Sequence, residues 1–389
     1  MNESSFDRPA SPPQQLSTGD FLPDDPPLMI GHSPKGIAIC AGLFLLTCAS
    51  TFVNGMLYGE RTPTTTSTDL LWDGLSYAGP LMLILAAHEM GHYLMARWYR
   101  VPATLPIFIP LWPVWLWFLF LPIPWLPLPQ LLPQLGGAFH FAVLGLFGTM
   151  GAVIVQQAGF AHRKATFDIG IAGPLAGLVI ALPVAWLGIQ QAHLVEFTAG
   201  GLTYGDPLIL KLMVWWKFGP LPPNHDVALN PLLYAGWVGI FLTGLNLVPI
   251  SQLDGGHILY TLTGRRAHVL SYIMFAAAAA FMMYFGRLEY ALILILLAMM
   301  GLRHPPTTND DMPLGLARHI LGWITLAVLF VVCFTPFPLT FNDPPVPPSQ
   351  MRPLPPGEGD ITVQRSLNTA PARNSSDGDR IAMSNETMR

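Results

Sequence analysis

Two histidines and a glutamate stand close together inside an apolar stretch of this sequence. The stretch runs from about residue 75 to 98, and it contains His88, Glu89 and His92. On a helix, residues four apart lie on one face, so both imidazoles can reach one metal ion. Glu89 lies beside them, where its carboxylate can take a proton from water. The spacing therefore predicts a site for one Zn²⁺ per chain, held by His88 and His92, with Glu89 as general base.

A catalytic zinc ion normally takes a third protein ligand and keeps one position open. In many soluble metalloproteases the motif is followed by a glycine and then by a third zinc-binding histidine. Here those two positions hold Met95 and Trp98, which are not zinc ligands. Asp254 is the strongest candidate, because Pro249 breaks the preceding apolar run and glycines follow, so the carboxylate can project into a helical bundle. Asp168 is the alternative, although a carboxylate near a helix N-terminus is stabilised there without a metal.

The composition indicates an integral membrane protein. Of the 389 residues, 52% are hydrophobic and 11% are charged, whereas soluble domains carry about 25% charged residues. The formal net charge of -4 comes without a basic stripe, which argues against a nucleic-acid partner. The cysteines all lie in apolar runs, at a spacing that fits neither a disulfide framework nor a thiolate metal site: Cys40, Cys48 and Cys333.

Seven apolar runs have about the length that a bilayer crossing needs. The sequence predicts them at about 36–56, 75–98, 168–189, 232–252, 268–284, 288–302 and 316–336. Ten basic residues fall on the side of the loop between the second and third runs, against four on the opposite side, leaving aside five in the C-terminal tail. The positive-inside rule then places the N-terminus in the cytoplasm and the predicted site near the cytoplasmic side.

The segments between and around these runs are irregular. Nine prolines and four tryptophans interrupt the stretch 102–133, which predicts an interfacial or re-entrant loop rather than a spanning helix. The next stretch, 148–155, combines glycines with β-branched residues, which predicts a short strand. Residues 1–35 and 339–389 are rich in proline and polar residues, so we expect disordered tails around a membrane-embedded domain at 36–338.

Three motifs occur in a fixed order along the segment 75–265. They are HEMGH at 88–92, FDIGIAGPLAG at 167–177 and NLVPISQLDGG at 246–256. With these motifs the sequence resembles the site-2 proteases, zinc-dependent intramembrane metalloproteases, in the branch without a PDZ domain that includes bacterial and chloroplast proteins. The resemblance implies an all-α polytopic fold, a three-helix core that holds zinc through His88, His92 and Asp254, and a role for Asn246 in binding the substrate or its oxyanion. Bacterial relatives often read His-Pro where this chain has Asn230-Pro231.

The predicted function is hydrolysis of a peptide bond within or next to a membrane helix of a substrate protein, in a bacterial inner membrane. A helix must unwind before its carbonyls can be attacked. The free edge of the predicted strand could pair with the unwound segment, through Gly148, Ala152 and Val153. The alternative is a transporter or channel that uses the same His/Glu/Asp cluster as a path for metal ions or protons. No inverted repeat is apparent in the sequence, which weighs against a transporter.

Overall fold

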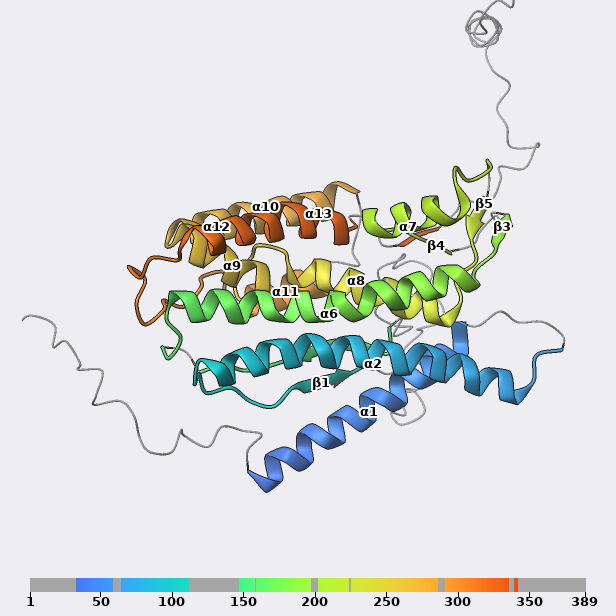
Figure 1. The fold of residues 1–389 in the computed structure, drawn as a ribbon, viewed down its shortest axis with the longest axis horizontal. Helices are drawn as coiled ribbons and strands as arrows, with labels where there is room; N and C mark the ends of the chain where they lie inside the picture. Colours follow the sequence, from blue (N-terminus) through green and yellow to red (C-terminus); the bar gives the residue numbers. More distant parts are fainter. Residues whose placement is uncertain are drawn as a thin grey trace, which may run out of the picture. The chain divides into compact units, whose positions relative to one another are not determined.

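The computed structural model is mostly helical (Figure 1). It describes residues 33–58, 64–111, 147–157, 159–196, 202–223, 225–285, 291–335 and 339–341. Within these residues, five helical runs are long and apolar enough to cross a membrane. They are α1 (Pro34–Tyr58), α2 (Ser67–Trp98), α6 (Arg163–Gln191), α10 (Arg266–Phe285) and a last run that joins α12 (Leu316–Ile324), the π-helical turn η3 (Thr325–Leu329) and α13 (Phe330–Cys333).

The other helices of the described chain are shorter. α8 (Pro231–Asn246) and α11 (Ala291–Met300) are apolar, and they occupy the fourth and sixth of the runs predicted to cross. α7 (Leu208–Phe218) and α9 (Asp254–Thr263) have no counterpart among the predicted runs. Each predicted run thus contains a helix in its described part, whereas the count of seven crossings stays a prediction.

The helices α2, α6 and α8 pack against one another around a shared apolar core. α6 contacts both α2 and α8, and Figure 1 shows α2 and α6 side by side. Tyr77, Leu81 and Trp237 are completely buried between them. The rings of Tyr77 on α2 and Tyr234 on α8 stack with centroids 5.1 Å apart. Close packing of large rings leaves little room for relative movement, so these helices form a rigid frame for side chains that project between them.

Side-chain caps fix where these helices begin. Thr66 and Asp69 form a reciprocal capping box at the start of α2. At the start of α8, Asn230 Oδ1 accepts a hydrogen bond from the N–H of Leu233 at 2.8 Å, and its Nδ2 donates to the carbonyl oxygen of Gly188 on α6 at 2.8 Å. The asparagine that stands where relatives often have histidine is therefore a helix cap that also ties α8 to α6.

The predicted strand is present and has a partner. β2 (Thr149–Val153) lies inside the stretch 148–155 and pairs antiparallel with β1 (Ile107–Pro110). β1 belongs to the proline-rich stretch predicted to be an irregular loop, so that prediction was wrong for its first part: a strand forms where the backbone finds a partner. The rest of the stretch, 112–133, with its four tryptophans, lies outside the described residues.

Two further short antiparallel pairs lie elsewhere in the described chain. They are β3 (Leu194–Glu196) with β5 (His225–Val227), and β4 (Leu202–Tyr204) with β6 (Leu339–Phe341). β6 falls at the start of the stretch 339–389 that we expected to be disordered, and α1 includes the last two residues of the stretch 1–35. Backbone pairing and helix formation therefore extend slightly beyond the apolar runs, and residues 1–32 and 342–389 lie outside the described ones.

Candidate metal centre

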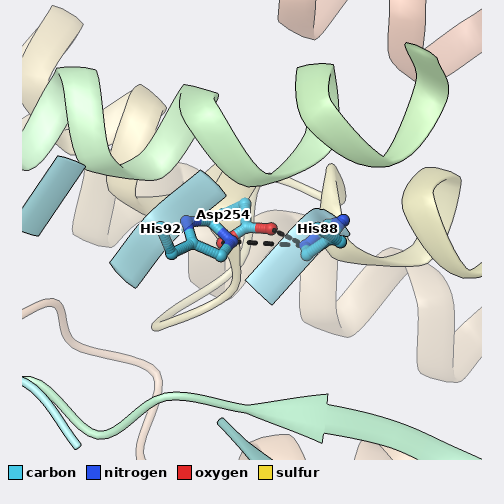
Figure 2. A group of neighbouring side chains, drawn as sticks. All are labelled: His88, His92 and Asp254. Atoms are coloured by element: carbon cyan, nitrogen blue, oxygen red, sulfur yellow. Dashed lines mark hydrogen bonds and ion pairs between the residues drawn. The ribbon is translucent and has the colours of Figure 1, made fainter. Parts of the chain in front are cut away.

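The motif histidines and Asp254 converge on one point. His88, Glu89 and His92 lie toward the C-terminal end of α2 and are 5%, 5% and 7% exposed. Asp254 is the first residue of α9, and its side chain is 13% exposed. Figure 2 shows the two imidazoles and the carboxylate pointing toward one another alongside α6. The structure thus brings together the three residues predicted to bind zinc.

The donor atoms of the three groups lie close enough together to share one metal ion. The Nε2 atoms of His88 and His92 are 3.2 Å apart. One carboxylate oxygen of Asp254 lies 3.2 Å from His88 Nε2, and the other lies 3.2 Å from His92 Nε2. Bonds of about 2.0–2.1 Å from zinc to nitrogen or oxygen put neighbouring ligand atoms of a tetrahedron about 3.3 Å apart. Two imidazoles and a carboxylate at this spacing fit a Zn²⁺ ion.

A backbone carbonyl sets the tautomer of one histidine. His92 Nδ1 lies 2.7 Å from the carbonyl oxygen of Ile169 on α6. A carbonyl oxygen only accepts, so Nδ1 carries the proton and the neutral ring keeps its lone pair on Nε2. Nε2 is the atom that faces His88 and Asp254, so the second shell prepares His92 to bind a metal through it.

Two glycines of α6 make room for the imidazoles. A Cβ built at Gly173 would lie 2.0 Å from His92 Nε2, and one at Gly177 would lie 3.1 Å from His88 Nδ1. A side chain at position 173 would therefore occupy the place of a ligand atom. This close approach gives a physical reason for the small residues of the motif at 167–177.

Asp254 reaches the histidines because the chain turns sharply between α8 and α9. The turn contains Pro249, and Ser251 within it has a left-handed backbone conformation with φ 55°. α9 then begins with Asp254. The next residue, Gly255, has no room for a side chain, because a Cβ there would lie 2.1 Å from the carbonyl oxygen of Leu247. The break predicted from proline and glycine thus aims the carboxylate into the bundle.

Asp168, the alternative third ligand, has other partners. Its two oxygens accept hydrogen bonds from Nε and Nη2 of Arg318, both at 2.8 Å, and Tyr99 also donates to it through its hydroxyl. Burial and the neighbouring carboxylate raise the pKa of Tyr99, so the phenol stays a donor. Asp168 is therefore balanced by a guanidinium, and it links α6 to α12 instead of joining the histidines.

Glu89 and Asn246 face the same cavity as the three clustered residues. The cavity has a volume of about 500 Å³, which is within the usual range for ligand pockets. Asn246 Nδ2 lies 3.3 Å from His88 Nε2, so its amide is next to the candidate metal position. A carboxylate and an amide beside that position can exchange a proton with water and donate a hydrogen bond to an oxyanion, respectively.

The cavity also extends to the strand predicted to bind substrate. Ala152 and Val153 line it, as do the residues that continue β2 to position 157. Gly148 does not line this cavity. It is buried beside α1, where Ser50 Oγ donates to its carbonyl oxygen at 2.6 Å. Gly148 is thus placed to anchor the start of β2, whereas Ala152 and Val153 are placed to meet a bound molecule.

Two histidines that the sequence did not single out also line the cavity. His257 follows Asp254 by three residues on α9, and His304 lies in the connection between α11 and α12. His257 Nδ1 lies 2.6 Å from His304 Nε2. The spacing of Asp254 and His257 on one helix face was a usable signal for the first. The second is far from every motif, and only the fold brings it to the cavity.

Comparison with known proteins agrees with this geometry. The family model described as Peptidase family M50 matches residues 76–286. The chain is 25% identical over 292 residues to "Probable zinc metalloprotease EGY2, chloroplastic" of Arabidopsis thaliana, across 70% of this chain and 44% of that protein. It is 27% identical over 201 residues to "Probable zinc metalloprotease EGY1, chloroplastic" of Oryza sativa subsp. japonica, across 50% of this chain and 29% of that protein.

The matches cover different shares of this chain and of its relatives. The chain spans less than half the length of these curated relatives, and no solved structure is significantly similar to it. The family model, however, covers more than half of the chain and runs from α2 to the end of α10, so that it contains the whole histidine and aspartate cluster. This membrane protein therefore belongs to peptidase family M50, the family of the site-2 proteases.

Proposed function

We propose that this protein is a zinc-dependent intramembrane endopeptidase, which hydrolyses peptide bonds within or next to the membrane helices of other membrane proteins. The observation that carries the proposal is the 3.2 Å spacing of donor atoms on His88, His92 and Asp254, with Glu89 in the same cavity. Three of these residues, His88, Glu89 and His92, lie on a helix long and apolar enough to cross a bilayer. The relatives are named zinc metalloproteases, which supports Zn²⁺ as the metal, and one cluster among the described residues could hold it.

The residues around the cavity have different roles in hydrolysis. His88, His92 and Asp254 would hold the ion. Zinc bound there would supply Lewis acidity for polarising a carbonyl group and for making water more acidic. Glu89 is not a ligand; it accepts the proton of the attacking water and returns it to the leaving amine. Asn246 donates from Nδ2 to the carbonyl oxygen as negative charge develops there.

The substrate binds as an extended strand along β2. The carbonyl oxygen of Val155 accepts a hydrogen bond from the N–H of Thr104 at 3.0 Å, so the peptide groups of Val155 face the β1 side. Peptide groups alternate in direction along a strand, so those of Ile154 point to the other edge. That edge has no strand partner among the described residues. A peptide paired there runs past Ala152 and Val153 into the cavity, with its backbone recognised independently of its sequence.

The metal centre lies near the cytoplasmic side of a bacterial inner membrane that the chain crosses seven times. The distribution of basic residues supports a cytoplasmic N-terminus. The pairing of β6 with β4 supports an even number of crossings between these two strands, because paired strands lie on one side of the membrane in either orientation. β4 belongs to the connection between α6 and α8, predicted to be external, and β6 follows the last crossing, which is predicted to end on that side.

A transporter or channel, the other function considered for this cluster, has weaker support. A conduction path needs polar groups along the depth of the membrane. Here the two imidazoles and the carboxylate converge on one point, and the family and the named relatives are peptidases. The cluster is therefore better suited to hold an ion than to pass one on.

Glu89→Gln is the variant that tests the proposed function. Purified wild-type protein and variant, both in lipid nanodiscs, should bind equal amounts of zinc. Only the wild type should cleave a model substrate with one membrane helix, and the rate of the variant should fall by about a hundredfold or more, because an amide cannot accept the proton. Glu196→Gln is the matched control: it changes an exposed glutamate on β3 and should leave cleavage unchanged.

Two outcomes would contradict the proposal. Cleavage by Glu89→Gln at the wild-type rate would remove the proposed base. Zinc or proton flux through wild-type protein in liposomes, without cleavage of any model substrate, would favour the transporter.

A further inference from the structure

The connection between α11 and α12 supplies part of the cavity wall. Residues 304–307, with the sequence His-Pro-Pro-Thr, line the cavity together with Glu89 and the metal-binding cluster. These residues lie outside the segment 76–286 that the family model matches. A part of the chain beyond the matched core therefore faces the reacting groups.

Contacts with α9 and α10 hold the first residue of this wall. The ring of His304 stacks on that of Tyr260 with centroids 4.3 Å apart. Its carbonyl oxygen lies 3.1 Å from His268 Nε2. His304 is 7% exposed, and burial lowers its pKa to about 3, so its ring is neutral. A neutral, stacked and nearly buried ring is a fixed part of the wall.

The hydrogen bond between His304 and His257 has a defined direction. His304 Nδ1 lies 2.6 Å from the carbonyl oxygen of Pro305, which can only accept, so Nδ1 carries the single ring proton. His304 Nε2 is then an acceptor, and His257 Nδ1 donates to it at 2.6 Å. His257 is three residues from Asp254 on α9, so this bond attaches the wall to the helix that begins with the metal-binding aspartate.

The other end of the segment is also anchored. Asp310 accepts hydrogen bonds from Thr307 Oγ1 at 2.6 Å and from the hydroxyl of Tyr260 at 2.8 Å. The N–H of Thr308 donates to the carbonyl oxygen of Ala161 at 3.0 Å. Tyr260 thus contacts the first residue of the segment through its ring, and Asp310 links its hydroxyl to the last residue. The wall is held against α9 and against the chain that follows β2.

The two prolines decide how this wall can meet a substrate. Proline has no backbone N–H, so Pro305 and Pro306 cannot donate to a strand as the residues of β2 can. They present apolar rings instead; Pro306 is exposed and Pro305 is half-buried. An apolar surface distinguishes side chains by size and shape, typically by about tenfold or more for each methylene group by which they differ.

We propose that residues 304–307 form a specificity-determining wall, which contacts the substrate side chains next to the scissile bond while β2 binds the substrate backbone. This inference rests on the proposed peptidase function. His257 and His304 are positioning residues in it, because they hold the two prolines at the cavity.

A panel of model substrates tests the wall. The substrates have one membrane helix and differ only in the residue on each side of the scissile bond, which is Ala, Leu or Phe. In the double variant Pro305→Ala, Pro306→Ala, the ratio of kcat/KM between Phe and Ala substrates should change by about tenfold, with unchanged zinc content. Pro313→Ala is the matched control, because Pro313 is exposed in the same connection and does not line the cavity. Wild-type ratios in the double variant would overturn the inference.

The positioning role predicts a second shift of the same ratio. His304→Ala removes both the bond to His257 and the stacking on Tyr260, so it releases the wall. The Phe-to-Ala ratio should move as it does in the proline variant. A purely structural role would instead lower kcat/KM for all substrates by the same factor, and that result would contradict the positioning role.

Photocrosslinking separates failure of this inference from failure of the proposed function. Benzoylphenylalanine replaces Pro306, Pro313 or Val153 in the zinc-loaded Glu89→Gln protein, and the Phe substrate is the probe. Position 306 should capture the substrate beside its scissile bond, and position 313 should not. Capture from position 153 but not from 306 would overturn the wall. Capture from position 306, with no cleavage by wild-type protein, would overturn the peptidase function and leave the contact standing.

Discussion

Two aspartates near the beginnings of helices face different partners in this structure. Asp254 opens α9, and its oxygens lie 3.2 Å from the imidazoles of His88 and His92. Asp168 lies near the start of α6, and its oxygens lie 2.8 Å from the guanidinium of Arg318. Both were candidates for the third zinc ligand, because each is an acidic residue beside an apolar run.

The partners explain why only one of the two fits a metal site. A guanidinium is always charged, so the carboxylate of Asp168 is balanced without another ion. Asp254 instead faces two imidazoles, and ring nitrogens and carboxylate oxygens are donor types that Zn²⁺ takes in proteins. The partners around each aspartate therefore separate the two candidates, more than their places on a helix do.

The largest expected effect comes from replacing Asp254, with the same change at Asp168 for comparison. Asp254→Asn should weaken zinc binding by more than about a hundredfold, because loss of a second-shell partner alone costs about 10–100-fold. Cleavage should be lost with the zinc. Zinc content after dialysis against a chelator of known affinity measures the change, with Asp168→Asn as the matched control. Full zinc content in Asp254→Asn, with loss in Asp168→Asn, would make Asp168 the ligand.

The sequence was sufficient to predict that His88, His92 and Asp254 would lie together. The i, i+4 spacing of His88 and His92 fixes their common face on any helix, and Glu89 follows from its place beside them. Pro249 and the glycines favoured Asp254 over Asp168, but only the tertiary structure shows that Asp168 is bonded to Arg318. His304 was beyond reach, since no local spacing relates it to the motif and only the packing of the connection after α11 brings it to the cavity.

The fold, like the site, was predicted only in part from the sequence. Apolar runs predicted helices in every case, because burial in lipid requires each backbone group to be bonded within its own segment. The helix ends were less accurate: α2 begins at Ser67 rather than at about 75, because the capping box of Thr66 and Asp69 extends it past the apolar run. β1 was missed because its pairing with β2 is a long-range event that its proline-rich composition does not reveal.

A smaller effect is expected at the glycines of α6 that make room for His88 and His92. Gly173→Ala should weaken zinc binding by about tenfold or more, because the new Cβ would lie 2.0 Å from His92 Nε2 and the ring must move. Gly177→Ala should have less effect, because its Cβ would lie 3.1 Å from His88. Gly79→Ala on α2 is the control, with no atom within 4 Å of the built Cβ. Equal zinc affinity in all three variants would show that the helices adjust and that the glycines do not shape the site.

The smallest effect is expected at Asp168, and it should appear in stability rather than in zinc. The Arg318 side chain is 34% exposed and that of Asp168 is 18% exposed, so solvent weakens the pair and Asp168→Asn should cost about 1 kcal/mol. A thermal shift of a few degrees in nanodiscs, at unchanged zinc content, measures it. Arg318→Gln should give a similar shift, and the double variant should be destabilised by less than the sum, because both changes remove one shared interaction. Strict additivity would show that the two residues are not coupled. Asp168 would then be no more balanced by its neighbour than Asp254 is, and the contrast between the two aspartates would fail.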